Sequence, residues 1–209
     1  MRTKALILAA AVSAMGIASS MAQVYSVNAV GYINVSCPAG FSMIAHQFTV
    51  PSRKLSDLIP APLPATSVYK LVGGGYQIYT FDDLDLVWTP NGDVEIELGA
   101  GVFINSPSAQ TLTFVGEVPQ GTLTTPTPSG FSIRSSQVPQ QGTVGQLGLV
   151  GQPADQVYKL VGSGYQIYTF DDLDLVWTPS EPVINVGESF FLNKAPGGST
   201  TWTRTFSVN

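Results

Sequence analysis

One stretch of 23 residues occurs twice in this chain, and this repetition constrains the fold more than any other feature. "VYKLVGGGYQIYTFDDLDLVWTP" runs from Val68 to Pro90, and "VYKLVGSGYQIYTFDDLDLVWTP" runs from Val157 to Pro179. The two copies differ only where Gly74 is replaced by Ser163. Weaker matches on both sides keep nearly the same spacing, so the repeat spans about 89 residues, enough for a small domain. The sequence therefore predicts two copies of one domain.

The first 22 residues predict a secretory signal peptide that is removed from the mature chain. A basic start is followed by a short apolar run, and Ser20 and Ala22 suit a cleavage site before Gln23. The two β domains are then expected at residues 23–115 and 116–209. We expect a secreted protein, located outside the cell, on the cell surface or in the periplasm. No later stretch is long and apolar enough for a spanning helix, so we expect no membrane span in the mature chain.

The mature chain is acidic and carries few charges. Cleavage removes Arg2 and Lys4, which leaves 7 basic and 14 acidic residues and a net charge of −7. Such a chain lacks the basic surface that binds nucleic acid or anionic lipid, so we expect no nucleic-acid partner. Frequent Gly, Pro, Thr and Val favour strands over helices. With a single cysteine, Cys37, no intramolecular disulfide can form, and hydrophobic cores must hold the fold.

Both copies show the pattern of short strands separated by turns. In the first copy strands are expected at 31–36, 41–48, 68–72, 76–81, 102–105 and 111–115; the second adds 121–125, 131–138, 189–194 and 201–206 to its copy of the hairpin. A helical turn is expected at 52–59 and, less clearly, in "GTVGQLGL". The predicted fold class is all-β: two tandem small barrels or sandwiches from the internal duplication, each with one short helical turn.

The duplicated hairpin turns at Gly73–Gly75 and again at Gly162–Gly164. Two-residue hairpin loops of type I′ need a positive φ at both central residues, which Ser163 disfavours. We therefore expect a three-residue loop with its positive φ at Gly75 and Gly164. In that register Tyr69 faces Tyr79.

Catalytic residues are scarce. Cys37 and His46 are the single cysteine and the single histidine, so they form the one nucleophile–base pair of that kind that the chain offers. The expected strand geometry separates them by about 13 Å, whereas a base must come within about 3 Å of its nucleophile. The second copy has Thr127 and Ser136 at these positions. We predict that the protein is not an enzyme and has no cofactor.

An acidic triplet follows the hairpin in each copy and suggests calcium as an alternative to a cofactor-free protein. The residues are Asp82, Asp83 and Asp85 in the first copy and Asp171, Asp172 and Asp174 in the second. Carboxylates grouped on a loop are typical Ca²⁺ ligands in extracellular modules. Aspartates are also common in solvated turns after a strand, and the spacing is not that of an EF-hand. We favour the solvated turn and keep calcium as the alternative.

Aromatic residues recur beside these triplets, as they do on carbohydrate-binding surfaces. Small β domains also need aromatic side chains for their cores, and we expect most of them to be buried. Trp88 and Trp177 lie between a charged loop and Thr-Pro, so we expect them to be exposed. The candidate sugar-binding residues are Trp88, Trp177, Tyr79 and Tyr168, and the candidate ligand is a polysaccharide.

The two ends of the mature chain share a short motif. "YSVN" begins at Tyr25 and "FSVN" begins at Phe206, where the chain reaches the start of a next repeat. One interpretation is head-to-tail association, in which the C-terminal strand of one molecule joins the sheet of another and builds a homo-oligomer or filament. The other interpretation is a coincidence of a few letters.

Core packing alone does not explain why the repeated block is identical, because polar residues such as Lys70 and Gln77 are identical too. Two explanations remain open: recent copying of the gene segment, or two copies that present the same face to the same target.

The stretches "QVYSVNAVGYINV", "GF-S", "VPQGTL" and "W-P…VG-SFF" resemble a set of uncharacterised secreted tandem-repeat β-proteins from environmental Gram-negative bacteria. This resemblance implies secretion and a repeat structure, and it implies no activity or site. We expect a secreted, non-enzymatic structural or adhesive protein of the cell envelope or extracellular matrix. The alternatives are a bivalent carbohydrate- or calcium-dependent binding module and an outer-membrane β-barrel.

Overall fold

The computed structural model describes residues 29–208, so the predicted signal peptide, Tyr25 and Asn209 lie outside the described residues. Strands make up 49% of the described residues and helix 2%, which confirms the all-β prediction. None of the sheets closes into a barrel. Among residues 29–208, no helix has the length and apolar character needed to cross a membrane.

The two repeats share the strands of their five-stranded and two-stranded sheets, but within residues 29–208 the short helix α2 occurs in the first repeat alone, and β10 and β14 occur in the second alone. The first has β1 (Val30–Cys37), β2 (Gly40–Ile44), α2 (Leu55–Leu58), β3 (Ser67–Val72), β4 (Gly75–Phe81), β5 (Trp88–Thr89), β6 (Val102–Ser106) and β7 (Gln110–Glu117). The second has β8 (Gly121–Pro126), β9 (Gly130–Ser135), β10 (Gly142–Thr143), β11 (Gln156–Val161), β12 (Gly164–Phe170), β13 (Trp177–Thr178), β14 (Val183–Ile184), β15 (Ser189–Lys194) and β16 (Thr201–Phe206).

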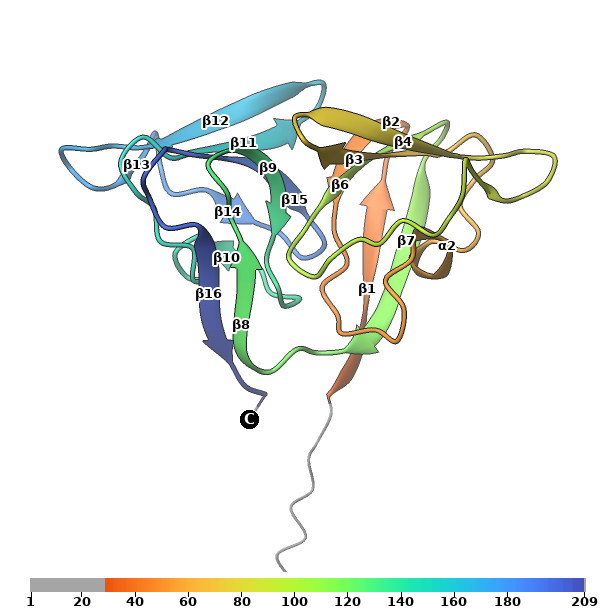
Figure 1. The fold of residues 1–209 in the computed structure, drawn as a ribbon, viewed down its shortest axis with the longest axis horizontal. Helices are drawn as coiled ribbons and strands as arrows, with labels where there is room; N and C mark the ends of the chain where they lie inside the picture. The colour runs from red at the N-terminus through yellow and green to blue at the C-terminus, as the bar shows by residue number, and fades with distance from the viewer. Residues whose placement is uncertain (1–28, 209) are drawn as a thin grey trace, which may run out of the picture.

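Strand order is also the same in both repeats. The first repeat has a five-stranded sheet, β2-β6-β3-β4-β5, and a two-stranded sheet, β1-β7. The second repeat has β9-β15-β11-β12-β13 and β8-β16, with a short β10-β14 ladder. All strand pairs are antiparallel. Figure 1 shows the two repeats side by side, each with its five-stranded sheet at the top and its two-stranded sheet below.

Each repeat has its own hydrophobic core between these two sheets. Alternate residues of β1, Ile33, Val35 and Cys37, point inward, as a strand with one buried face requires. In the first repeat they pack with Leu55 of α2 and Ile104 of β6. The core of the second repeat is built around residues from β11, β15 and β16.

The prediction of a three-residue hairpin loop is wrong. Val72 pairs with Gly75 and Tyr69 pairs with Ile78, so the loop has two residues. Gly73 and Gly74 have φ angles of 59° and 84°, the two positive values of a type I′ turn. In the second copy Gly162 has a φ of 61° and Ser163 has no positive φ, as in a type II′ turn. A change of turn type, and not a longer loop, therefore accommodates the serine.

The repeats contact each other through backbone pairs that a pseudo-twofold axis exchanges. Ile44 bridges to Glu188, and Ala100 bridges to Arg134, which is the same contact with the repeats interchanged. The N–H of Ala45 donates to the carbonyl of Gly187 at 3.0 Å, and its counterpart is the bond from Ser135 to Gly99, also 3.0 Å. β2 meets the loop that precedes β15 of the second repeat, and β9 meets the loop that precedes β6 of the first repeat.

Glycine is required in these loops because the repeats approach closely there. Gly187 has a φ of 75°, and a Cβ on it would lie 2.4 Å from Cγ2 of Val35 in the first repeat. Its counterpart Gly99, with a φ of 79°, would place a Cβ 2.1 Å from Oγ1 of Thr125 in the second repeat. The seam between the repeats therefore tolerates no side chain at either position.

We predict that Gly187→Ala destabilises the protein more than Gly40→Ala. Both glycines have positive φ, but a Cβ on Gly40 would meet no atom within 4 Å, so only Gly187→Ala adds a steric clash. The expected difference in the free energy of unfolding is about 1–3 kcal/mol, the usual cost of overpacking, and urea denaturation measures it. Equal losses in the two variants would contradict the close approach of the repeats.

Candidate functional site

Eight aromatic rings form one continuous cluster across the boundary between the repeats. Phe103 of β6 and Phe191 of β15 meet at the pseudo-twofold axis, with ring centroids 5.4 Å apart. Further ring contacts of 5.4–6.4 Å extend from this pair into both repeats. We call these rings the aromatic cluster: Phe41, Tyr69, Tyr76 and Phe103 in the first repeat and Phe131, Tyr158, Tyr165 and Phe191 in the second.

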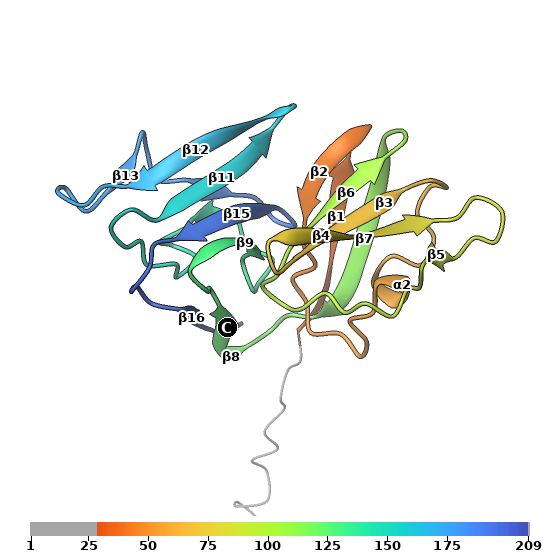
Figure 2. The same cartoon turned by 45° about the horizontal axis from the view of Figure 1, so that its top comes forward.

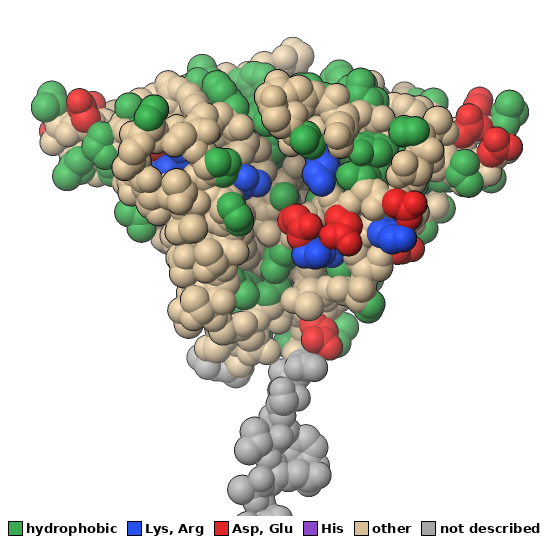
Figure 3. All heavy atoms as spheres, viewed as in Figure 1, with side chains coloured by type: hydrophobic (Ala, Val, Ile, Leu, Met, Phe, Trp, Pro, Cys, Tyr) green, Lys and Arg blue, Asp and Glu red, His purple; other side chains and the backbone are tan. Residues whose placement is uncertain are grey.

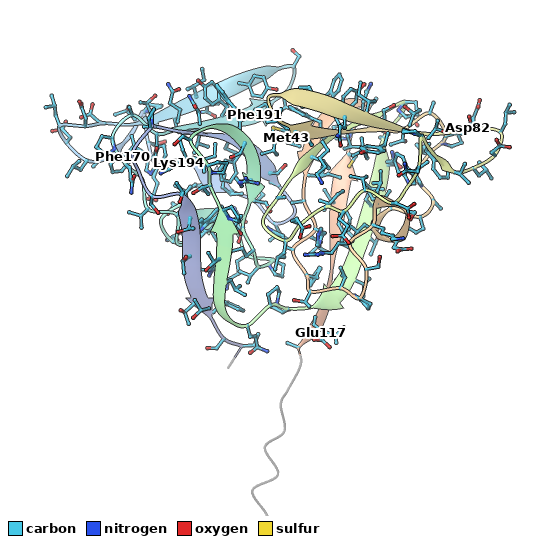
Figure 4. All side chains as sticks on the ribbon, viewed as in Figure 1. Met43, Asp82, Glu117, Phe170, Phe191 and Lys194 are labelled. Atoms are coloured by element: carbon cyan, nitrogen blue, oxygen red, sulfur yellow. The ribbon has the colours of Figure 1, made fainter. Side chains whose placement is uncertain are left out.

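The strand pattern explains why these rings lie outside the two cores. Tyr69 follows the buried Val68 on β3, and Phe103 precedes the buried Ile104 on β6, so each faces the opposite side of its sheet. The outer faces of the two five-stranded sheets meet in the middle of the molecule, where Met43, Phe103 and Ile133 are buried together. Figure 4 places Met43 and Phe191 close to each other between the two halves.

Two pockets open on the aromatic cluster, and the pseudo-twofold axis exchanges them. The Ser163 pocket, about 730 Å³, is lined by Pro38, Ala39, Gly40, Phe41, Tyr69, Tyr76, Phe103, Leu160, Gly162, Ser163 and Tyr165. The Gly74 pocket, about 790 Å³, is lined by Leu71, Gly73, Gly74, Tyr76, Pro128, Ser129, Phe131, Tyr158, Tyr165 and Phe191. Both volumes lie within the range of small-ligand sites, about 300–1,000 Å³.

Each pocket combines the sheet face of one repeat with the hairpin tip of the other. The tip of the β11–β12 hairpin lies beside β2 (Figure 2) and supplies the residues of the second repeat that line the Ser163 pocket. The β3–β4 tip does the same for the Gly74 pocket. Tyr76 and Tyr165 line both pockets, so the two pockets share these two tyrosines. Neither pocket is complete in one repeat alone.

The pockets are uncharged and retain half-exposed rings. No Lys, Arg, Asp, Glu or His lines either of them. Phe41, Tyr76, Phe131 and Tyr165 are each 45–55% exposed, unusually open for aromatic side chains gathered in one place. Burial raises the pKa of Tyr76 and of Tyr165, and the neighbouring Tyr165 phenol adds to the effect on Tyr76. Both phenols therefore stay neutral around pH 7 and can donate and accept hydrogen bonds.

The structure buries the aromatic residues that the sequence proposed for sugar binding. Trp88 and Trp177 are only 4% and 8% exposed, so the expectation that they are exposed is wrong. The Trp88 indole packs on Phe81 and donates to the carbonyl of Ile59 at 2.9 Å. Tyr79 and Tyr168 are likewise buried and face the cores. All four side chains occupy inward-facing positions of short strands and are buried in the cores. None of them offers an exposed ring on which a sugar could stack.

The outer-face residues could have been found from the sequence by combining two signals. Tyr69 and Tyr76 recur in the repeated block, and Phe41 and Phe103 recur as Phe131 and Phe191 at the offset of the repeat. Period-two alternation with core residues then puts them on the solvent side of their strands. Only the packing of one repeat on the other brings them into shared pockets.

The Asp triplets lie on the β4–β5 and β12–β13 loops, at opposite ends of the molecule. Figure 3 shows acidic and hydrophobic side chains together at both ends. Oδ1 of Asp82 accepts hydrogen bonds from the N–H groups of Leu84 (2.8 Å) and Asp85 (2.9 Å), and Asp171 repeats this arrangement. These bonds lower the pKa of both carboxyls. Within residues 29–208 no three acidic, Cys or His side chains are grouped to hold a metal, and calcium binding stays a prediction.

The C-terminal strand pairs within its own repeat. β16 runs antiparallel to β8, with Phe206 opposite Gly121. The guanidinium of Arg204 lies over the Phe206 ring, 5.3 Å from its centroid. One edge of this strand is therefore occupied already, and head-to-tail assembly through Phe206 and Tyr25 stays a prediction.

Cys37 and His46 are both buried. Burial raises the pKa of the Cys37 thiol to about 11, so the thiol is neutral at pH 7 and a poor nucleophile. The Nε2 atom of His46 lies 2.8 Å from the carbonyl oxygen of Ile96. Burial lowers the pKa of His46 and outweighs the opposing effect of this hydrogen bond.

Comparison with known proteins gave no match to a protein-family model, to a curated protein or to a solved structure.

We predict that His46 makes the protein less stable in weak acid. Its pKa is near 6.5 in the unfolded chain and lower in the folded protein, so only the unfolded chain gains a proton as the pH falls below about 6.5. The melting temperature should fall between about pH 7.5 and about pH 5.5. His46→Gln keeps a side-chain donor for Ile96 but cannot titrate, so its melting temperature should fall less over the same range. Parallel curves for the two proteins would contradict this prediction.

Proposed function

We propose that this protein is a secreted, non-enzymatic adhesive or structural protein that holds neutral polysaccharide in the two pockets of the aromatic cluster. The observation that carries the proposal is the pair of uncharged aromatic pockets at the seam between the repeats. The proposal combines two of the functions that the sequence suggested, namely an adhesive protein and a bivalent carbohydrate-binding module.

The chemistry of the lining favours a sugar over other neutral ligands. One face of a pyranose ring exposes mainly C–H groups, which can stack on aromatic rings, while its hydroxyls remain available for hydrogen bonds. Half-exposed tyrosines and phenylalanines suit such a ligand, because their rings supply apolar area and the phenols supply donors and acceptors. An acyl chain is buried best in a closed aliphatic cavity, and rings that stay about half exposed would leave much of it in water.

Two pockets on one molecule support an adhesive function. Because the pseudo-twofold axis exchanges the pockets, each molecule offers two similar sites to two segments of polymer. One protein molecule could therefore connect two chains, or two parts of one chain, without assembling itself. Binding to a long polymer then gains from both pockets together.

Isothermal titration with cellohexaose, xylohexaose, chitohexaose and maltohexaose tests the proposal. We predict that at least one of them binds the mature protein with two sugars per chain. Tyr76→Ala should weaken binding by about thirtyfold or more, since removal of a central aromatic anchor that acts as a hot spot costs about 2 kcal/mol or more. Tyr165→Ala should have the same effect, because both rings line both pockets. The affinity should change little with salt, because no charged side chain lines either pocket.

Tyr32→Ala is the matched control for these variants. Tyr32 is an exposed tyrosine on β1 that lines neither pocket, so its loss should leave the affinity unchanged. Failure of all four sugars to bind would reject the proposal. So would sugar binding that neither Tyr76→Ala nor Tyr165→Ala weakens.

A further inference from the structure

Two basic side chains that form no ion pair among residues 29–208 line one and the same pocket. The mature chain has 7 basic residues, and four of them are ion-paired: Arg53, Lys54, Lys159 and Lys194. Arg204 lies over the Phe206 ring. The other two, Lys70 and Arg134, come from different repeats and line a pocket of about 350 Å³, which we call the Lys70–Arg134 pocket.

Both side chains have hydrogen-bond partners that carry no charge. Nζ of Lys70 donates to the carbonyl oxygen of Glu95 at 2.6 Å, and Nη1 of Arg134 donates to the carbonyl oxygen of the preceding residue at 3.3 Å. Nε of Arg134 is buried and has no partner within the described part of the chain. Burial lowers the pKa of this guanidinium. A partly buried cation without a counter-charge costs free energy, and an anionic ligand would offset that cost.

The lining of the Lys70–Arg134 pocket includes one acidic residue, Glu97, which already has a cationic partner. Its carboxylate accepts a hydrogen bond from the guanidinium of Arg53, a residue outside this lining. The same guanidinium also pairs with Glu95, at 3.1 Å. The nearby carboxylates are thus engaged by Arg53, and Lys70 and Arg134 remain available to an anion.

The pocket at the corresponding place in the other half of the molecule has no such surplus of positive charge. This twin pocket, about 220 Å³, is lined by Glu188, which forms an ion pair with Lys159 at 3.2 Å. Lys159 corresponds to Lys70, but Glu188 corresponds to Ala100, so the repeat unit of Lys70 lacks the matching carboxylate. Arg134 adds a second cation opposite Ala100.

The Lys70–Arg134 pocket is continuous with the Gly74 pocket. Both are lined by the hairpin-tip residues Leu71, Gly73 and Gly74 and by Pro128 and Phe131 of the second repeat. A sugar ring that packs on Phe131 in the Gly74 pocket can therefore extend a substituent into the Lys70–Arg134 pocket. The planar guanidinium of an arginine matches a carboxylate better than it matches a hydroxyl.

We infer that the Lys70–Arg134 pocket binds the carboxylate of a uronic acid whose ring lies in the Gly74 pocket. The placement of the ring rests on the proposed function, and the inference narrows the ligand to a polysaccharide that combines neutral sugars with uronic acids. Lys70 and Arg134 then make this half of the seam selective for an acidic sugar, whereas the Ser163 pocket takes a neutral one.

Nuclear magnetic resonance titration of the mature protein with methyl glucuronide and methyl glucoside tests this inference. The two sugars differ only at C6, which carries a carboxylate in one and a hydroxymethyl group in the other. Followed at the amide signals of Gly73 and Gly74, the glucuronide should bind about tenfold or more tightly than the glucoside, because hydrogen bonds to charged groups are the stronger ones. This preference should shrink in about 0.5 M NaCl, which screens charges.

Substitutions separate the contribution of the two cations from that of the ring. Lys70→Gln and Arg134→Gln should each remove most of the preference and leave the affinity for the glucoside nearly unchanged. Ala100→Glu should also remove it, because it restores the carboxylate that Glu188 supplies in the twin pocket. Lys54→Gln is the matched control: it removes one positive charge from a side chain that does not line the pocket and should have no effect. Phe131→Ala should weaken the binding of both sugars at these signals.

The outcomes distinguish failure of this inference from failure of the proposed function. Equal affinities for the two sugars, or a preference that survives Arg134→Gln, would overturn the carboxylate site, while binding of neutral hexasaccharides would still support the proposed function. Glucuronide binding that Phe131→Ala does not weaken would overturn the placement of the ring. If Arg134→Gln fails to fold, Ala100→Glu decides, since that variant retains both basic residues.

Discussion

The backbone contact between the repeats is the interaction on which the rest of the structure depends. Ile44 bridges to Glu188 and Ala100 bridges to Arg134, and glycines at 99 and 187 let the chains approach too closely for any side chain. These contacts hold the outer faces of two sheets against each other, with Phe103 and Phe191 in contact at the centre. Without them each repeat would keep its core, but its aromatic outer face would lie open to water and neither pocket would exist.

The repeated block has two faces with different roles. Its inward residues, among them Val68, Tyr79 and Trp88, pack in the core of their own repeat. Of its outward residues, Tyr76 lines both pockets, Tyr69 the pocket on its own sheet, and Leu71 the pocket that its hairpin tip completes. A substitution on the outward face of the block therefore changes the contact surface between the two repeats and the pockets there. This gives a physical reason for keeping the two copies alike. Recent copying of the gene segment would produce the same identity.

Outside the repeated block, the two repeats satisfy their buried polar groups in different ways. In the second repeat Lys194 and Asp155 form an ion pair with both side chains only 2% exposed, and Asp155 also accepts hydrogen bonds from the N–H groups of Gln152 and Ala195. In the first repeat the equivalent positions hold Thr66 and Ser106, and Gln110 donates to both hydroxyls at 3.0 and 2.7 Å. A buried charge needs a partner of opposite charge, whereas neutral groups need only hydrogen bonds, and both repeats meet their requirement.

The sequence by itself determined the all-β class, most strand positions and the duplicated hairpin, because these depend on local preferences and on alternation along the chain. It did not determine the turn type, because Gly73 and Gly162 permit more than one geometry. It also misplaced the site: it predicted exposure for Trp88 and Trp177, which the cores bury. The pockets were decided by tertiary structure alone, since each is built from residues of both repeats, which lie far apart in the sequence. No local pattern encodes how one sheet face packs against another.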